Sequence, residues 1–257
     1  MIDHTAFTWR RTAAYRTRSF GGPAIMALIV VVIGILAIAF QDYWILLLAL
    51  AFAATAVPPL LAPAPRVTLT KAGVEIEQRK PLLNSHVLFP VAMTIGAVGV
   101  TIQAVVGSPT GGNARLPFIA VAAWVLVALT LRNAVAYRGK LVVEPNSVSV
   151  PGRFELTVDG IHANLVQQRK LAFPYLELTN DASESKPQLI FPTMCYGLEA
   201  NSLTSTVLHL SETDPASRSS YSPELIREML LFKPDREVAV GDSIEVRVVA
   251  QPRATTP

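Results

Sequence analysis

Residues 23–65 read PAIMALIVVVIGILAIAFQDYWILLLALAFAATAVPPLLAPAP, and the rest of the chain is interpreted from this stretch. It holds two uncharged segments, Pro23–Phe40 and Tyr43–Ala62, separated only by Gln41-Asp42. An apolar helix of this length reaches about 27 Å, close to the hydrocarbon thickness of a bilayer. Neither segment has the polar face of a helix in a soluble protein. The sequence therefore predicts two membrane-spanning helices joined by a tight turn.

A secretory signal peptide is the alternative interpretation of the first segment, because arginines precede it. However, the apolar stretch is longer than a typical signal core, and a second apolar segment follows at once without a clear cleavage site. We therefore expect an uncleaved anchor.

Two further apolar segments predict a third span, at about Val87–Gly107, and a fourth, at about Leu116–Ala136. The predicted fold class is thus a membrane domain of four transmembrane helices in two hairpins over residues 23–136, plus a mainly-β domain. Residues 1–136 carry 10 Lys and Arg against 4 Asp and Glu, whereas residues 137–257 carry 12 against 15. Since positive residues flank the spans, we expect a multi-pass plasma (inner) membrane protein with both termini in the cytoplasm.

The N-terminal segment, residues 1–22, is basic and interleaved with aromatic residues. We expect it to lie on the anionic lipid surface. The candidate contacts to lipid headgroups are Arg10, Arg11, Arg16 and Arg18. The predicted partners are therefore membrane lipids and not nucleic acid.

The remaining polar segments favour β-structure. Residues 66–80 alternate as a short hairpin, in which Gly73 can supply a positive φ. Residues 137–250 predict a cytoplasmic β-rich domain with hairpins turning at Pro145-Asn146, Asp159-Gly160 and Gly241-Asp242. A helix is expected near residues 222–232, where a serine cap precedes a proline and an acidic residue. Residues 251–257 are expected to be a disordered tail.

A short internal repeat links the two β regions. Leu69–Val74 and Leu156–Ile161 both match L-T-x-x-G-[VI] after a pair of predicted spans. Either the chain contains a duplicated unit or ordinary hairpin chemistry has produced the same six residues twice.

The sequence offers no constellation typical of an enzyme. The four histidines are scattered, and no phosphate-binding, dinucleotide-binding or nucleophile-elbow motif occurs. Cys195 is the only cysteine and is interpreted as a small buried side chain. Ser183 and Lys186 match S-x-x-K formally, but their polar surroundings favour a surface loop. We expect no enzymatic activity, no metal and no cofactor.

One face of the third predicted span carries small residues and an amide, namely Ala92, Gly96, Gly99 and Gln103. Small residues allow helix backbones to approach closely, and glutamine can donate or accept a hydrogen bond across the contact. The face either packs within this protein, which we favour, or docks against a transmembrane helix of a partner.

Two functions from different classes remain open. In the first, the protein is a non-enzymatic accessory subunit that assembles, stabilises or regulates a larger membrane complex. In the second, it is a stand-alone membrane-anchored module that binds lipid or peptide. Copurification distinguishes them, because a subunit brings stoichiometric partners.

The strand pairs reading L-T-x-x-G and the segment SPELIREMLLFKPDR at Ser222–Arg236 resemble PH-like integral membrane proteins of actinobacteria. The overall layout is also similar to the Luc-type accessory proteins of mycobacterial Mce lipid importers. This resemblance implies a possible PH-like β domain and a role in a fatty-acid or sterol importer. The PH-like pattern has seven strands and a closing helix, whereas here a strand pattern follows the predicted helix.

Overall fold

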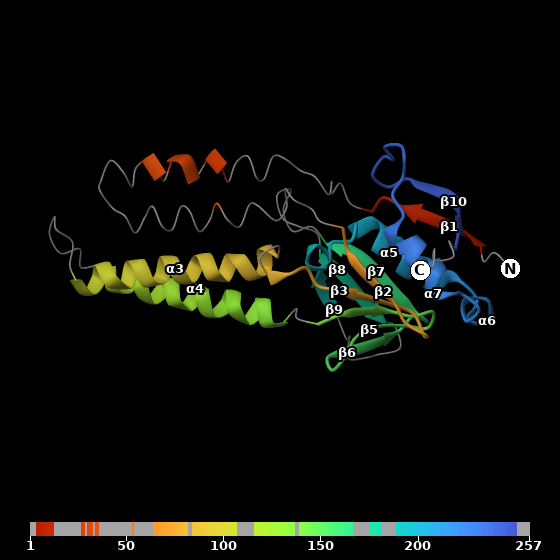
Figure 1. Cartoon of the computed structure of the whole chain (residues 1–257), viewed down its shortest axis with the longest axis horizontal. Coiled ribbons are helices and arrows are strands. Elements are labelled where there is room, and N and C mark those ends of the chain that lie inside the picture. The colour runs from red at the N-terminus through yellow and green to blue at the C-terminus, as the bar shows by residue number, and fades with distance from the viewer. Residues whose placement is uncertain are drawn as a thin grey trace, which may run out of the picture. The chain divides into compact units, whose positions relative to one another are not determined.

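The computed structural model separates into two compact units, which are treated one at a time. Unit 1 comprises Met1–Arg16, Pro63–Arg79 and Gly139–Pro257, and unit 2 comprises Thr17–Ala62 and Lys80–Arg138. Figure 1 shows the elements of both units. The structure describes residues 4–12, 27, 28, 30–32, 34, 35, 53, 64–81, 84–106, 116–136, 139–166, 175–180 and 189–250.

A five-stranded antiparallel sheet in unit 1 has the order β2-β3-β4-β5-β6. Its strands are β2 (Arg66–Leu69), β3 (Val74–Glu77), β4 (Leu141–Val143), β5 (Ser147–Val150) and β6 (Phe154–Thr157). Val74 of β3 lies opposite Val143 of β4, so the hairpin at residues 66–77 belongs to the same sheet as strands that follow far later in the chain. The predicted turn at Pro145-Asn146 is confirmed, because β4 and β5 pair directly across it.

The other strands of unit 1 form a second sheet and a two-stranded ribbon. The second sheet has the order β7-β8-β9, with β7 at Ile161–Val166, β8 at Tyr175–Asn180 and β9 at Leu189–Pro192. The ribbon pairs β1 (His4–Arg10) with β10 (Ser243–Val249), so it joins the two ends of the described chain.

A short 3-10 helix, η2 (Thr193–Tyr196), and three α-helices separate β9 from β10. The α-helices are α5 (Ala200–Glu212), α6 (Pro215–Arg218) and α7 (Pro223–Leu231). The predicted helix near residues 222–232 is confirmed, and the Ser222 hydroxyl accepts a hydrogen bond from the Leu225 N–H at 3.3 Å. Its apolar side, with Leu225, Met229 and their neighbours, is buried as the spacing predicts.

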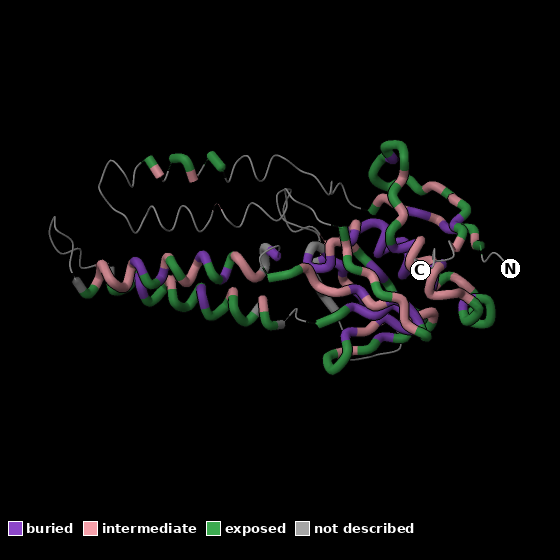
Figure 2. Tube along the Cα trace, viewed as in Figure 1, coloured by how far each residue is buried: buried purple, intermediate pink, exposed green. Residues whose placement is uncertain are grey.

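The core of unit 1 combines alternating residues of the strands with one side of α5 and α7. Figure 2 shows buried residues concentrated in these strands and in α5. Val74, Ile76, Leu141 and Val143 are completely buried on one face of the first sheet. This alternation follows from the period of two along a strand, since successive side chains point to opposite faces.

Unit 2 contains two long apolar helices, α3 (Ser85–Val106) and α4 (Leu116–Ala136), which pack along each other. Among the described residues, one helical segment, Val87–Val105, is long and apolar enough to cross a membrane. The apolar part of α4 that the structure describes, Pro117–Arg132, is shorter than the length that a span requires. The first two predicted spans lie largely outside the described residues.

The predicted fold class, with four transmembrane helices, is therefore wrong. The described residues show mixed helix and strand content, several sheets and a single candidate spanning helix, while the β-rich domain agrees with the prediction. Uncharged stretches identify apolar helices, but the length of the apolar run decides whether such a helix reaches across the hydrocarbon layer. A multi-pass location is not supported.

Two predicted hairpins are also wrong. Asp159-Gly160 does not join a pair, because β6 ends the first sheet and β7 begins the second. Gly241-Asp242 does not turn one strand back on another, because β10 pairs with β1 at the opposite end of the chain. The two L-T-x-x-G segments therefore occupy different settings: a hairpin turn in the first case and a crossing between sheets in the second.

Gly73 serves a purpose that differs from the predicted one. Its φ is not among the positive values, which occur at other glycines such as Gly160. Instead, a Cβ at Gly73 would collide with the Val143 carbonyl oxygen and the Glu144 backbone of the neighbouring strand. The position requires glycine for the close approach of two backbones.

Candidate functional site

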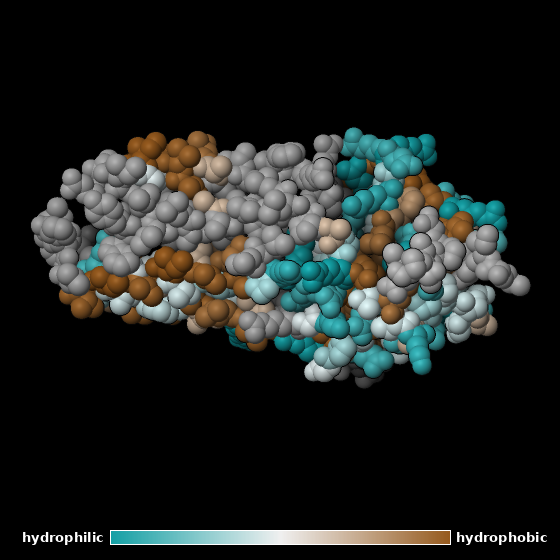
Figure 3. All heavy atoms as spheres, viewed as in Figure 1, coloured by the Kyte–Doolittle hydropathy of each residue, from teal (hydrophilic) through white to brown (hydrophobic). Residues whose placement is uncertain are grey.

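The most distinctive surface of the described chain is the apolar exterior of α3 and α4, which we call the apolar helix surface. Figure 3 shows hydrophobic side chains along these helices. The exposed large hydrophobic residues of this surface are Phe89, Val91, Ile95, Val98, Val105, Phe118, Ile119, Val121, Trp124, Val125, Leu126, Leu129, Leu131 and Val135. Contiguous exposed apolar surface of this kind marks contact with a membrane or with another protein.

The threonine hydroxyls and the Trp124 indole of α3 and α4 are hydrogen-bonded within these two helices. The Trp124 indole N–H donates to the Thr101 hydroxyl at 3.0 Å, which links the two helices. The hydroxyls of Thr94 and Thr101 donate to backbone carbonyls four residues earlier, at Pro90 and Ala97. Internal satisfaction of this kind is what an apolar solvent requires of a helix.

The predicted small-residue face of α3 lies at least partly inside the protein. Ala92 is 1% exposed and Gly99 is buried, whereas Gly96 and Gln103 are partly exposed. On α4, Ala120 and Val127 are similarly buried. Packing within the chain thus covers Ala92 and Gly99, and docking of this face against a partner helix stays a prediction.

The predicted headgroup-binding arginines have different surroundings. Both terminal nitrogens of Arg10 donate to the Glu212 carboxylate at 2.7 Å, which ties β1 to the end of α5. The Arg11 guanidinium donates to the Val238 carbonyl oxygen and lies 3.7 Å from a Glu237 carboxylate oxygen. Arg16 and Arg18 lie outside the described residues.

Helix α5 is lined with buried polar side chains, and sequence reasoning did not identify it as a helix. Asn201, Ser202, Thr204, Ser205 and Thr206 are all at most 1% exposed. Its N-terminus is capped by the Glu199 carboxylate, which accepts a hydrogen bond from the Ser202 N–H at 2.6 Å. The local signals of this helix are its acidic cap and the i, i+4, i+7 spacing of the buried Leu203, Val207 and Leu210.

These polar side chains fasten strand β1. The Trp9 indole donates to the Ser202 hydroxyl at 3.0 Å, and the Arg10 N–H donates to the Ser205 hydroxyl at 2.8 Å. The Thr12 N–H donates to the Asn201 side-chain oxygen at 3.0 Å. The hydroxyls and the amide of α5 therefore hold the C-terminal end of β1 and the residues that follow it.

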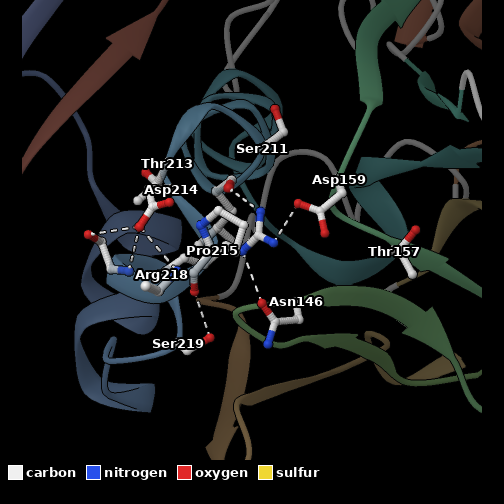
Figure 4. A network of polar contacts seen from close by, with 12 residues as sticks. Asn146, Thr157, Asp159, Ser211, Thr213, Asp214, Pro215, Arg218 and Ser219 are labelled. Carbon is white, nitrogen blue, oxygen red and sulfur yellow. Dashed lines mark hydrogen bonds and ion pairs between the residues drawn. The ribbon is translucent and has the colours of Figure 1, made fainter.

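Arg218 forms a second buried polar network, shown in Figure 4. Its guanidinium, 1% exposed, donates to Asp159 at 2.6 Å, to Asn146 at 3.0 Å and to the Leu210 carbonyl oxygen at 3.0 Å. Asn146 lies in the β4–β5 turn and Asp159 in the connection from β6 to β7. The network thus joins the two sheets to α5, and this geometry is that of a structural support.

His209 of α5 lies in a cluster beneath β1. Its Nε2 atom and the Thr5 hydroxyl each lie 3.2 Å from the Tyr221 hydroxyl, and its ring stacks on the Tyr221 ring. Burial lowers the pKa of His209 below 6.5, while Glu212 acts to raise it and Arg10 to lower it. A neutral imidazole at neutral pH suits packing against aromatic rings.

Reactive side chains do not gather elsewhere in the described part of the chain. Cys195 is buried, and the Tyr196 phenol beside it has its pKa raised mainly by burial. Within the described ranges, no group of three His, Cys, Asp or Glu side chains could hold a metal ion. Ser183 and Lys186 lie outside the described residues.

Comparison of the chain with protein-family models, with curated proteins and with solved structures found no match.

Proposed function

We propose that this protein is a non-enzymatic accessory subunit of a membrane complex, anchored by unit 2 and carrying unit 1 as its folded polar domain. The observation that supports the proposal is the apolar helix surface, because a water-exposed surface of this composition is unfavourable. Each large apolar side chain gains about 1.5–3 kcal/mol when it is fully removed from water.

Basic residues flank this helical pair in the sequence. Arg79 and Lys80 precede α3, and Arg138 and Lys140 follow α4. Since basic residues favour the cytoplasmic side of a membrane, we place unit 1 in the cytoplasm.

An accessory role fits the polar interior of unit 1. The buried polar groups described above are engaged by protein partners in α5, β1 and the Arg218 network. Such groups stabilise the fold, so binding of a partner would depend on residues at the surface of unit 1. Since the layout resembles accessory proteins of lipid importers, the membrane and ATPase subunits of such an importer are the first partners to look for.

The test is affinity purification of the tagged full-length protein in a gentle detergent, followed by mass spectrometry of the bound proteins. We expect stoichiometric recovery of the membrane subunits of one complex. A parallel purification in dodecyl sulfate is the control, because it retains no association that requires the native fold. Recovery of the bare protein with lipid alone would contradict the accessory role and favour a stand-alone lipid-binding module.

A further inference from the structure

The outer edge of β10 is an unpaired strand edge. β10 pairs with β1 along seven residues, from Ser243 opposite Arg10 to Val249 opposite His4. In the described part of the chain no strand pairs with its other edge, and no backbone hydrogen bond reaches it. Figure 1 shows β10 at the margin of unit 1. An open edge of this kind is a template for another strand.

The contacts of β1 show which backbone groups of β10 point outward. Both the N–H and the carbonyl oxygen of Arg10 bond to the Ser205 hydroxyl, so they point away from β10. Because antiparallel pairs alternate between hydrogen-bonded and non-hydrogen-bonded positions, Ser243 opposite Arg10 also points its backbone groups away from the ribbon. The same holds for every second residue after it, namely Glu245, Arg247 and Val249.

Two of these outward residues carry opposite charges. Glu245 and Arg247 are exposed on the same face of β10 and line a shallow hollow beside Ala6. Neither side chain has an ion-pair partner among the described residues. The edge therefore presents two exposed charges of opposite sign, two residues apart.

We propose that two copies of this chain associate by antiparallel pairing of their β10 strands about a two-fold axis at Val246. In this register Glu245 lies opposite Arg247 of the second copy, and Arg247 lies opposite its Glu245. Both positions point their backbone groups outward, so each pair is hydrogen-bonded as well as oppositely charged. In a two-fold contact the same surface of each copy faces the other, so that surface must be complementary to itself. The β10 edge meets this requirement, because it carries both charges of each opposed pair.

The two neighbouring registers are disfavoured by the same two charges. An axis at Glu245 would place two glutamates opposite each other, and an axis at Arg247 would place two arginines opposite each other. Like charges in directly opposed positions destabilise a strand pair. The spacing of the charges therefore selects the register centred on Val246.

The first test reverses the charges in the full-length protein and measures its mass in detergent by sedimentation. We expect E245R and R247E each to weaken dimerisation about tenfold, because two attractive pairs become repulsive. A mixture of the two single variants should form a heterodimer, and the double variant E245R/R247E should dimerise like the natural protein. The rescue also shows that each single variant has folded.

The second test fixes the register by oxidative cross-linking. The two copies of Val246 face each other at a non-hydrogen-bonded position, where Cα atoms lie about 4.5 Å apart, within the range of a disulfide. V246C should therefore cross-link readily. V249C is the matched control on the same strand, since its two thiols would lie about 20 Å apart.

Three results would overturn the proposal. They are a monomeric natural protein over the whole concentration range, a dimer unaffected by either charge reversal, and equal cross-linking by V246C and V249C. A bound protein of another kind in place of the second copy also counts against it, because the heterodimer rescue would then fail.

Discussion

Arg218 is the clearest case of a single side chain that supports distant parts of unit 1. It lies on the short helix α6, yet its three bonds reach the β4–β5 turn, the β6–β7 connection and the end of α5. Hydrogen bonds to a charged group are about twice as strong as those between neutral groups. Because the guanidinium is 1% exposed, water cannot replace these partners when one is lost.

We predict that Arg218→Leu lowers the free energy of unfolding by about 3 kcal/mol, since it leaves Asn146 and the Leu210 carbonyl without their donor. Arg227→Leu is the control, because Arg227 pairs with its neighbour Glu228 at a partly exposed position. That pair should contribute less than about 1 kcal/mol. Chemical unfolding of the full-length protein measures both, and equal losses would contradict the structural role of Arg218.

His209 makes the stability of unit 1 depend on pH. Its folded-state pKa lies below 6.5, so the unfolded chain binds a proton more readily than the native protein. The contribution of His209 to stability is therefore complete above pH 6.5 and is lost progressively as the pH falls toward the folded-state pKa.

We predict that His209→Gln reduces the loss of stability on acidification below pH 6.5, as measured by thermal unfolding across a pH series. His162→Gln, at an exposed position of β7, is the control for the histidine-to-glutamine exchange itself. An identical pH profile in the natural protein and His209→Gln would show that the imidazole does not carry the effect.

At the scale of elements, α5 is central to unit 1 because it holds the edge of β1 with side chains. Ser202 accepts from the Trp9 indole and lies 2.6 Å from the Phe232 carbonyl oxygen, so one hydroxyl joins β1, α5 and the end of α7. Buried polar side chains of this kind stabilise a helix packing arrangement only when every partner is present.

We predict that Ser202→Ala costs about 1–3 kcal/mol, because it leaves the buried Trp9 N–H without an acceptor. Adding Trp9→Phe should then cost less than it does in the natural protein, and this difference is the coupling between the two residues. Ser211→Ala, whose partly buried hydroxyl bonds to the Leu208 carbonyl oxygen of its own helix, is the control with little effect. Strictly additive losses would argue against the Trp9–Ser202 bond.

At the scale of the whole molecule, the chain divides its chemistry between two units. The large hydrophobic side chains of unit 1 are mostly buried, whereas many of those on α3 and α4 are exposed. A water-soluble helical pair would show polar residues on its outer side. This contrast is the reason for placing unit 2 in contact with a bilayer.

We predict that Leu126→Lys, on the exposed side of α4, weakens the proposed attachment of the protein to the membrane, because a charge is unfavourable in contact with hydrocarbon. Val240→Lys is the matched control, because Val240 lies in unit 1 and is 52% exposed, compared with 49% for Leu126. Resistance to alkaline extraction from membranes measures the difference. Equal behaviour of the two variants would mean that α4 faces water.

Several features of the candidate surfaces follow from local sequence, and others do not. Exposed apolar residues on α3 and α4 were expected from uncharged runs in the sequence. The number of spanning helices among the described residues was not predicted correctly, because the apolar part of α4 is shorter than a span requires. The ends of α7 were predictable, since Ser222 and Pro223 act within a single turn. The network of Arg218 was not predictable from the sequence, because its partners Asp159 and Asn146 lie 59 and 72 residues away.

Local patterns were therefore sufficient for the apolar character of α3 and α4, the β-rich composition of unit 1, the β4–β5 turn and the limits of α7. Each of these depends on interactions within a few residues. The pairing of β1 with β10, the separation of β6 from β7 into different sheets and the polar role of α5 were decided by the tertiary structure. Long-range packing determines which groups pair with a strand edge or with a buried hydroxyl. A hairpin pattern in the sequence does not show which distant strand will pair with the same edge.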